Sequence, residues 1–309
     1  MKIVMLDALT LGEFNATKFQ NLGDFTSYPI TNQDEILMRC KDAQIIITNK
    51  VILNAETLES LPNLQLICVA ATGTNNIDLQ AAKRHGIEVK NVAGYSTAAV
   101  AQHTLMLALA FLGQLPYYTS YVREGKWTQS NIFCHLGREI RDINQKEWGI
   151  IGFGTIGKQV CKLAQAFGTN VSYYSTSGSN TQCEIPHKSL DELLATSDII
   201  SIHAPFNEKT HNLIGLTQLK QLKKGAILLN LGRGGIVNEE ELAKSLKEQD
   251  FYFGADVLEK EPMIPNHPLL DSSIADKILL TPHIAWAHKD TKERLLELVV
   301  KNIETFLEK

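Results

Sequence analysis

Apolar residues occur in short runs separated by helical patterns along the first hundred residues. The runs predict four strands at positions 2–6, 44–48, 65–70 and 87–89. Between them, apolar positions with a helical period predict helices at 33–40, 55–61 and 79–85. Strands that alternate with crossover helices form parallel sheets, so this pattern predicts a doubly wound α/β domain.

A longer and almost wholly apolar segment follows at 96–112. It predicts a helix that is buried on several sides, between two domains or between two subunits. Ser96 or Thr97 is its candidate N-cap, and Gly113 with Pro116 is expected to end it.

Residues 117–145 carry aromatic side chains with little periodicity, which predicts an irregular arm that packs on another surface. The alternation returns from Lys146 onward. Strands are predicted at 148–152, 170–174, 198–203, 226–230, 251–257 and 278–281, and helices at 156–167, 190–195, 217–222, 239–248 and 289–307. The fold class is therefore α/β, with two doubly wound parallel-sheet domains.

Composition narrows the function. A length of 309 residues suits two domains, and a net charge of -4 gives no basic surface for nucleic acid or anionic membrane. The apolar runs fall short of the roughly 20 residues of a spanning helix, and the N-terminus is expected to be a first strand instead of a signal peptide. Five scattered cysteines without a CxxC pair predict reduced thiols and hence the cytoplasm.

The first chemical signal is the glycine motif GFGTIG at 152–157. It follows a predicted apolar strand and opens a predicted helix, the context that a dinucleotide site requires. Gly152 permits the tight turn, Gly154 lets the backbone approach a pyrophosphate, and Gly157 lets the helix pack closely on the strand. The motif therefore predicts dinucleotide binding, where the alternative is a glycine-lined packing turn.

The second strand of this half leaves the choice of nucleotide open. An NAD site usually has an Asp or Glu here for the ribose 2′-hydroxyl, but no acidic residue occurs between Glu147 and Glu184. No Arg is present to bind a 2′-phosphate either, and only hydroxyls such as those of Ser175 and Thr176 are available. Both NAD(H) and NADP(H) are compatible with the sequence.

Three later segments carry charged groups at the ends of predicted strands: Arg233, Glu261 (with Asp256 before it) and His283. Taken singly, each residue has an alternative role without catalysis. Arg233 could be a surface ion-pair partner, Glu261 a solvated loop acid and His283 an interior histidine. Ligand sites in open α/β sheets lie beyond the carboxyl ends of the strands. Three such groups beside a phosphate loop therefore predict one hydride-transfer site.

At this point the sequence resembles the D-isomer-specific 2-hydroxyacid dehydrogenase family over essentially its whole length. The matching segments are 71–78, 91–97, 100–103, 152–157, 203–210 and the stretches around Arg233, Glu261 and His283. The forms NVAGYSTAAVAQHT and TPHIAWA most resemble the glycerate dehydrogenase/hydroxypyruvate reductase branch. Gly232 stands where the family more often has Ala or Ser.

The resemblance implies a role for each matching residue. His283 protonates the substrate carbonyl, Glu261 orients its imidazole, and Arg233 binds the substrate carboxylate. Backbone N–H groups of Thr72 and Gly73 hold that carboxylate as well, and Asp256 bonds the nicotinamide carboxamide. The other implied cofactor contacts are Thr97, Gly152, Gly154, Thr155, Ile156, Gly157, Ser175, Thr176, Pro205, Thr210 and Leu231. No metal site is predicted.

The family's architecture implies a discontinuous substrate domain of flavodoxin-like type, at 1–97 with a returning helix at 286–309. A Rossmann-type dinucleotide domain at 98–285 lies between these parts. The implied partners are a small 2-oxo or 2-hydroxy acid, with hydroxypyruvate or glyoxylate favoured, and a second copy that packs through the long helix and the arm.

Two rival functions are considered. A catalytically silent nucleotide-sensing corepressor on the same scaffold is disfavoured because the proton donor and its Glu partner are both present. A formate dehydrogenase-like enzyme pairs its His with Gln and lacks a Glu-Pro segment, so Glu261 and Pro262 argue against it. The exact oxo acid, the reaction direction and the preferred nucleotide stay open.

Overall fold

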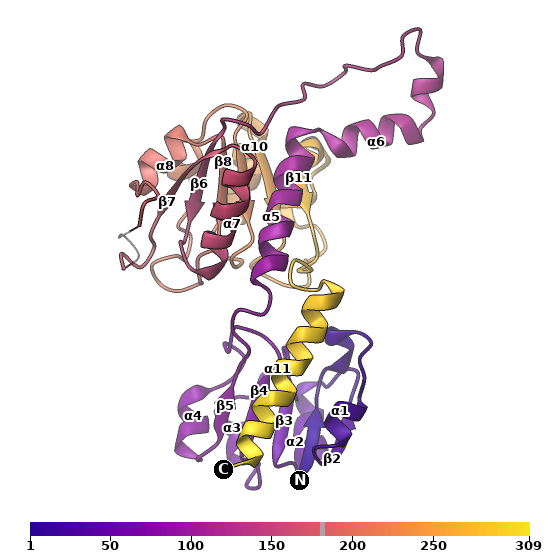
Figure 1. Cartoon of the computed structure of the whole chain (residues 1–309), viewed down its shortest axis with the longest axis vertical. Coiled ribbons are helices and arrows are strands. Elements are labelled where there is room, and N and C mark those ends of the chain that lie inside the picture. The colour runs from indigo at the N-terminus through magenta and orange to yellow at the C-terminus, as the bar shows by residue number, and fades with distance from the viewer. Residues whose placement is uncertain (180–182) are drawn as a thin grey trace. The chain divides into compact units, whose positions relative to one another are not determined.

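The computed structural model describes residues 1–179 and 183–309. By its internal contacts the chain divides into two units (Figure 1). The first unit is Met1–Ser96 with Trp286–Lys309, and the second is Thr97–Ala285. Each unit contains one wholly parallel sheet with helices on both faces, as the strand and helix pattern predicts.

The first unit has a five-stranded sheet in the order β2-β1-β3-β4-β5. Its strands are β1 (Lys2–Met5), β2 (Asp24–Ser27), β3 (Ile45–Thr48), β4 (Leu66–Val69) and β5 (Glu88–Lys90), and its helices are α1 (Thr17–Gln20), α2 (Ile36–Cys40), α3 (Ala55–Glu59), α4 (Leu79–Arg84) and α11 (Lys289–Leu307). This is the flavodoxin-like strand order. Apolar residues of α2, α3 and α4 pack on one face, and those of α1 and α11 pack on the other.

The second unit has a six-stranded sheet in the order β11-β10-β9-β8-β6-β7. Its strands are β6 (Glu147–Ile151), β7 (Asn170–Tyr174), β8 (Ile199–Ile202), β9 (Ile227–Asn230), β10 (Tyr252–Ala255) and β11 (Ile278–Leu280), and its helices are α5 (Thr97–Leu112), α6 (Leu115–Arg123), α7 (Thr155–Ala166), α8 (Leu190–Thr196), α9 (Leu216–Leu219) and α10 (Glu239–Glu248). The strand order reverses between β6 and β8. In an open α/β sheet such a switch point is where ligands bind.

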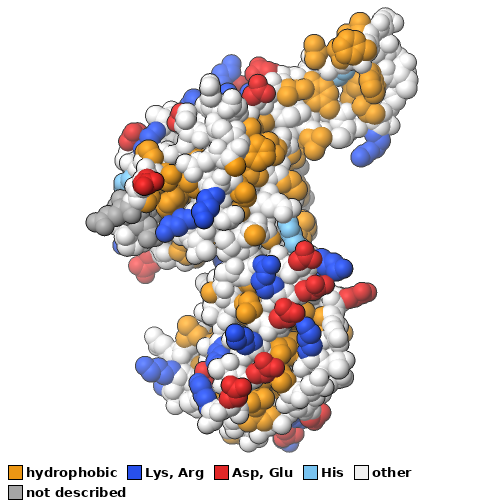
Figure 2. Space-filling model, in the orientation of Figure 1, with side chains coloured by type: hydrophobic (Ala, Val, Ile, Leu, Met, Phe, Trp, Pro, Cys, Tyr) orange, Lys and Arg blue, Asp and Glu red, His pale blue; other side chains and the backbone are white. Residues whose placement is uncertain are grey.

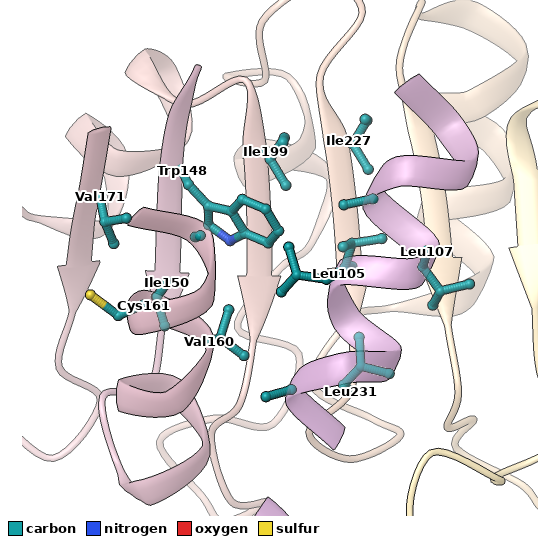
Figure 3. Close-up of a cluster of buried hydrophobic side chains, with 14 of the residues drawn as sticks. Leu105, Leu107, Trp148, Ile150, Val160, Cys161, Val171, Ile199, Ile227 and Leu231 are labelled. Atoms are coloured by element: carbon teal, nitrogen blue, oxygen red, sulfur yellow. The ribbon is translucent and has the colours of Figure 1, made fainter. Parts of the chain in front are cut away.

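The core of the second unit explains why α5 is so apolar (Figure 3). Trp148 of β6 is fully buried, and its Nε1 donates to Ser201 Oγ at 2.9 Å. Leu105 and Leu107 of α5 pack in the same cluster, beside Val160 of α7. The burial predicted for this helix thus comes in large part from the sheet of its own unit.

Two sequence predictions need correction. Strand β2 was not predicted because its residues, DFTS, are mostly polar and lie half-exposed or exposed at the edge of the sheet. Gly113 follows the last residue of α5, as predicted. Pro116, which was expected to help end α5, is instead the second residue of the next helix, α6. Proline is compatible with that position because its missing N–H would have no helical partner there.

The arm at 117–145 is also more ordered than its weak periodicity predicts. It contains most of α6 and a 3-10 helix at Lys126–Gln129. An aromatic cluster braces it: the rings of Tyr121 and His135 stack at 3.7 Å, and Tyr117 Oη lies 2.8 Å from His135 Nε2. Alternating periodicity could not reveal a cluster that forms between residues far apart in the segment.

Within residues 1–179 and 183–309, no single helix has the length and hydropathy to cross a membrane. Only the bent pair of α5 and α6, with a 63° break between them, satisfies the length and composition criteria. The five cysteines are free thiols, and burial raises the pKa of Cys40 and Cys68 to about 12.

Candidate active site and nucleotide pocket

All strands of the second sheet run in one direction, so their carboxyl ends share one edge. The loops at this edge contain Gly152, Ser175 and His203 after β6, β7 and β8. They also contain Arg233 after β9, Asp256 after β10 and His283 after β11. The sheet therefore gathers residues from six distant stretches of sequence along a single edge.

The glycine loop requires its glycines for steric reasons. Gly152 has a φ of 90°, and a Cβ there would lie 2.7 Å from the backbone nitrogen of Ala204. A Cβ on Gly157 would lie 2.3 Å from the Gly152 carbonyl oxygen. The loop can pass this closely over β8 and beneath α7 only without side chains at both positions.

A cavity of about 800 Å³ opens beside this loop. Its walls are formed by Gly152, Phe153, Gly154, Ser175, Thr176, Ser177, His203, Pro205, Asn207, Glu208 and Lys209. Helix α7 begins at Thr155, and Gly154 before it provides no side-chain cap for the first N–H groups. A Cβ on Gly154 would meet nothing within 4 Å, so this backbone borders open space. The site therefore fits a dinucleotide whose pyrophosphate accepts hydrogen bonds from the helix N-terminus.

The rim after β7 carries the hydroxyls that the sequence singles out. Ser175 is 6% exposed, and its Oγ lies 3.5 Å from that of Ser177. Thr176 and Ser177 line the cavity with it. Glu208 and Lys209, which were not predicted as site residues, reach the same cavity from the loop after β8. The two side chains have opposite charges. Both follow β8, whereas a ribose-binding acid normally follows the second strand of the domain, which is β7 here.

His203 is a second pocket residue that the sequence argument did not assign. Both of its ring nitrogens are buried and have no hydrogen-bond partner among the described residues. Burial lowers its pKa to about 3, so the ring is neutral at physiological pH. Its position in the motif HAPFNEKT was noted, but the motif gave no sign that the ring would form part of the cavity wall.

A smaller cavity of about 420 Å³ lies on the other side of the start of α7. Thr97 and Thr155, both predicted contacts, line it together with Lys158 and Lys162. The two lysines add positive charge beside the helix N-terminus, which favours an anionic ligand.

Five predicted cofactor contacts are not among the residues that line either cavity: Ile156, Gly157, Thr210, Leu231 and Asp256. Thr210 is fully buried; its hydroxyl donates to the Pro205 carbonyl at 2.7 Å and accepts from the Asn207 N–H at 2.8 Å. It therefore shapes the loop that forms the cavity wall. Leu231 is 6% exposed and packs in the core, so only its backbone is available to a ligand.

Asn230 holds the Arg233 loop in place at the end of β9. Its Oδ1 accepts from Gly232 N–H at 3.1 Å, and its Nδ2 donates to the Arg233 carbonyl at 2.9 Å. A Cβ on Gly234 would lie 1.9 Å from the Leu258 carbonyl oxygen, so this loop packs directly on the one that carries Glu261. The exposed Arg233 side chain uses one donor on Gly232 and keeps the others for a ligand.

Glu261 and His283 form the pair that the family resemblance implies. Nδ1 of His283 donates to Oε2 of Glu261 at 2.6 Å, and Glu261 Oε1 accepts from Leu258 N–H at 3.0 Å. The carboxylate thus fixes the ring orientation and places the bonded proton on Nδ1. Nε2 is then the ring nitrogen that can exchange a proton with a ligand.

The loop around His283 has an unusual backbone. His283 has a φ of 54°, in the left-handed region that few non-glycine residues occupy. Asp256, 3% exposed, accepts from the N–H groups of Ile284 and Ala285 at 2.8 Å and from Thr281 Oγ at 2.6 Å. These three hydrogen bonds use much of the acceptor capacity of the Asp256 carboxylate, which the family resemblance assigns to binding the nicotinamide carboxamide.

Thr72 and Gly73 lie in the first unit, after β4. The Thr72 side chain donates to the Val92 carbonyl at 3.0 Å, and its own carbonyl accepts from Asn91 Nδ2 at 2.5 Å. Their role in carboxylate binding stays a prediction from the resemblance. Across the described part of the chain, no group of three or more His, Cys, Asp or Glu residues is arranged to bind a metal ion.

Comparison with known proteins gives a consistent result. The family model of the D-isomer specific 2-hydroxyacid dehydrogenase NAD binding domain matches residues 105–285. A glycerate dehydrogenase of Methylorubrum extorquens is 36% identical over 308 residues, which cover 99% of this chain and 96% of that protein. A hydroxypyruvate reductase of Blautia hydrogenotrophica is 35% identical over 317 residues, which cover 99% and 97%.

Among solved structures, the D-lactate dehydrogenase of Aquifex aeolicus in complex with NAD and lactic acid superposes with a TM-score of 0.85. It is 27% identical, and the match covers 100% of this chain and 96% of that one. Solved structures with this fold hold NAD or NADPH. A chain so similar over nearly its whole length shares the family's chemistry as well as its fold: it belongs to the D-isomer-specific 2-hydroxyacid dehydrogenases and is an NAD(P)-dependent oxidoreductase.

Proposed function

We propose that this enzyme reduces hydroxypyruvate to D-glycerate, or glyoxylate to glycolate, with His283 as the proton donor. The observation that carries the proposal is the His283–Glu261 hydrogen bond of 2.6 Å at the same sheet edge as the nucleotide cavity. The names of the similar glycerate dehydrogenase and hydroxypyruvate reductase support the choice of substrate. Oxidation of glycerate at its second carbon gives hydroxypyruvate, so both names describe one interconversion.

The chain's own residues account for binding and for proton transfer. When bound, the reduced nicotinamide supplies a hydride to the substrate carbon. The N-terminus of α7, Gly152, Gly154, Ser175 and Thr176 would hold the dinucleotide, and Arg233 would bind the substrate carboxylate through its planar guanidinium. His283 Nε2 then gives its proton to the carbonyl oxygen, while Glu261 stabilises the charged imidazole before transfer.

The choice of a small oxo-acid substrate over a large one rests on the names of the similar glycerate dehydrogenase and hydroxypyruvate reductase alone. A panel of 2-oxo acids (hydroxypyruvate, glyoxylate, pyruvate and a branched-chain oxo acid) assayed with NADH and NADPH would test it. We expect the highest kcat/KM with hydroxypyruvate or glyoxylate. Faster reduction of the branched-chain acid would reject the substrate proposal and leave the reaction class intact.

The first prediction concerns His283. We expect His283→Asn to lower kcat by roughly 10²–10⁴-fold, because a positioned general acid contributes about that much. Binding of the reduced nucleotide, measured by its fluorescence, should change little, since His283 is placed at the substrate and not among the cavity residues. Turnover close to that of the wild type would contradict the assignment of the proton donor.

The second prediction tests the guanidinium of Arg233. Arg233→Lys keeps the charge but loses the planar arrangement of donors that matches a carboxylate. We expect substrate KM to rise strongly and kcat to fall, measured by initial rates at saturating nucleotide. Unchanged kinetics in this variant would show that the carboxylate is bound elsewhere.

The third prediction concerns nucleotide choice. Because the rim after β7 has hydroxyls and no acid, we expect the wild type to use both NADH and NADPH. Ser175→Asp should disfavour NADPH by on the order of 1–3 kcal/mol through repulsion of the 2′-phosphate. Thr176→Arg is the reciprocal variant and should favour NADPH.

Paired kcat/KM values for both nucleotides on all three proteins measure this effect. A preference that stays the same in Ser175→Asp would show that this side chain does not face the 2′ position. A strong preference for NADH in the wild type would show that hydroxyls or backbone geometry select the ribose.

We also propose a homodimer formed through α5 and the arm at 117–145, together with the start of α6. Apolar side chains that are 37–89% exposed follow one another along these segments: Met106, Leu109, Leu115, Val122, Trp127, Ile132, Phe133, Leu136 and Ile140. Figure 2 shows hydrophobic side chains gathered over the arm. Apolar surface of this extent is typical of an interface, and the aromatic cluster of Tyr117, Tyr121 and His135 keeps the arm ordered enough to present it.

The fourth prediction follows from this surface. Phe133→Asp combined with Leu136→Asp should convert a dimer into a monomer in analytical ultracentrifugation, because two charges would be buried without partners. Met38→Asp is the control, since Met38 is 75% exposed on α2, outside the arm. A wild-type protein that sediments as a monomer at micromolar concentration would reject the dimer.

A further inference from the structure

The His283 loop depends on a buried chain of hydrogen bonds that begins on a different element, α5. His103 of α5 is 4% exposed, and its Nε2 lies 2.9 Å from Thr281 Oγ. Thr281 Oγ in turn donates to Asp256 Oδ1 at 2.6 Å. Asp256 then accepts the two backbone N–H groups that follow His283, from Ile284 and Ala285. This series of hydrogen bonds thus links α5 to the residues on both sides of His283.

We propose that His103 and Thr281 are positioning residues of the enzyme, which act through Asp256 to hold His283 where it can transfer its proton. The proposal rests on the proposed function, in which His283 is the proton donor. It adds two residues that are not among those lining the nucleotide cavity.

The proton positions in this chain follow from the donor inventory. An ionised carboxylate only accepts, and two of the three donors to Asp256 are backbone N–H groups, which only donate. The single hydroxyl proton of Thr281 therefore points to Asp256. Thr281 Oγ is left as an acceptor toward His103, so His103 must carry a proton on Nε2. The hydrogen bonds therefore all run in one direction, from His103 through Thr281 to Asp256. Each residue donates to the next one in this order.

The backbone at His283 explains why such support is required. A non-glycine residue at a φ of 54° is less stable than one in the usual regions and persists only where its surroundings fix it. Thr281, which precedes His283, is held by its N–H to Ala255 and by its hydroxyl to Asp256. Ile284 and Ala285, which follow it, are held by the same carboxylate. Asp256 therefore fixes the segment on both sides of the strained residue.

The same chain joins both ends of the second unit. Helix α5 starts at Thr97, the first residue of this unit, and Ala285 is its last. His103 and Asp256, both almost wholly buried, connect these two ends through Thr281, which is half-buried. Buried polar networks of this kind specify one arrangement only while every member is satisfied.

The test replaces the middle member with an isostere. Thr281→Val removes the hydroxyl and keeps the shape, so Asp256 loses one donor and His103 loses its acceptor. We expect kcat for oxo-acid reduction to fall by about 10- to 100-fold, since a small misplacement of a catalytic group has this effect. Thr281→Ser restores the hydroxyl and should recover most of the activity.

The matched control is Thr104→Val, on the same helix. Thr104 is fully buried, and among the described contacts its hydroxyl donates to the Val100 carbonyl within α5. We expect this variant to keep wild-type turnover. Fluorescence titration with the reduced nucleotide should give a similar dissociation constant for both valine variants, which shows that each is folded.

The rate per nucleotide-binding site separates positioning from a merely structural role. Among the described contacts, the titratable groups at this segment are Glu261 on the ring, Asp256 on the backbone and His103, whose Nε2 lies 2.9 Å from Thr281 Oγ and 3.8 Å from Asp256 Oδ1. Arg233, and not this chain of hydrogen bonds, is proposed to bind the substrate carboxylate, so in Thr281→Val we expect kcat to fall while substrate KM stays near that of the wild type. Loss of folded protein alone would leave kcat per nucleotide-binding site unchanged.

If Thr281→Val does not fold, variants at His103 carry the same test. His103→Gln keeps an N–H donor toward Thr281 and should stay closer to the wild type, whereas His103→Leu should show the lower kcat per nucleotide-binding site with an unchanged substrate KM. His283→Asn is measured in parallel. If it retains turnover, the proton-donor assignment fails and the positioning role fails with it. If it is inactive while Thr281→Val or His103→Leu matches Thr104→Val, only the positioning role is overturned.

Discussion

The parallel direction of all six strands in the second sheet is the constraint on which the site depends. Because every strand ends at the same edge, residues between positions 152 and 283 of the sequence come together there. The strand order reverses between β6 and β8, and the glycine loop after β6 packs against Ala204 just beyond β8. The nucleotide cavity opens at this point, as expected for a switch point in an open sheet.

At that edge, three buried or half-buried polar side chains shape the loops that carry the exposed chemistry. Asn230 holds the Arg233 loop, Asp256 holds the His283 loop, and Thr210 holds the loop that lines the cavity. Each satisfies backbone groups that would otherwise have no partner in an irregular segment. The reactive side chains are thereby left free for ligands while the backbone beneath them is fixed.

Helix α5 serves several needs at once, which accounts for its composition. Its apolar side covers the sheet next to α7, His103 lies in the polar chain to Asp256, and its first residue borders the cavity at the start of α7. Two of its exposed residues, Met106 and Leu109, continue the apolar surface of the arm. A helix with one solvated face could not combine these roles, since its polar face would interrupt the surface proposed for a second copy.

The sequence alone determined the elements with a strong local pattern. The alternation of apolar runs and helical periods gave the two parallel sheets, and the glycine motif placed the phosphate loop, because both signals arise from neighbouring residues. The charged residues at strand ends predicted a common site, since parallel strands end at the same edge, and the family resemblance implied that Glu261 pairs with His283 there. The family resemblance added roles that spacing by itself does not supply.

Only the tertiary structure decided the features that depend on contacts between distant segments. Strand β2 exists because β1 pairs with it, although its own residues are polar. The order within the arm comes from rings that meet across it. The support of His283 comes from α5, about 180 positions earlier, because the hydrogen-bond range of a side chain is set by distance in space. The segment 100–103 resembles the family, but no local pattern shows which residue His103 contacts.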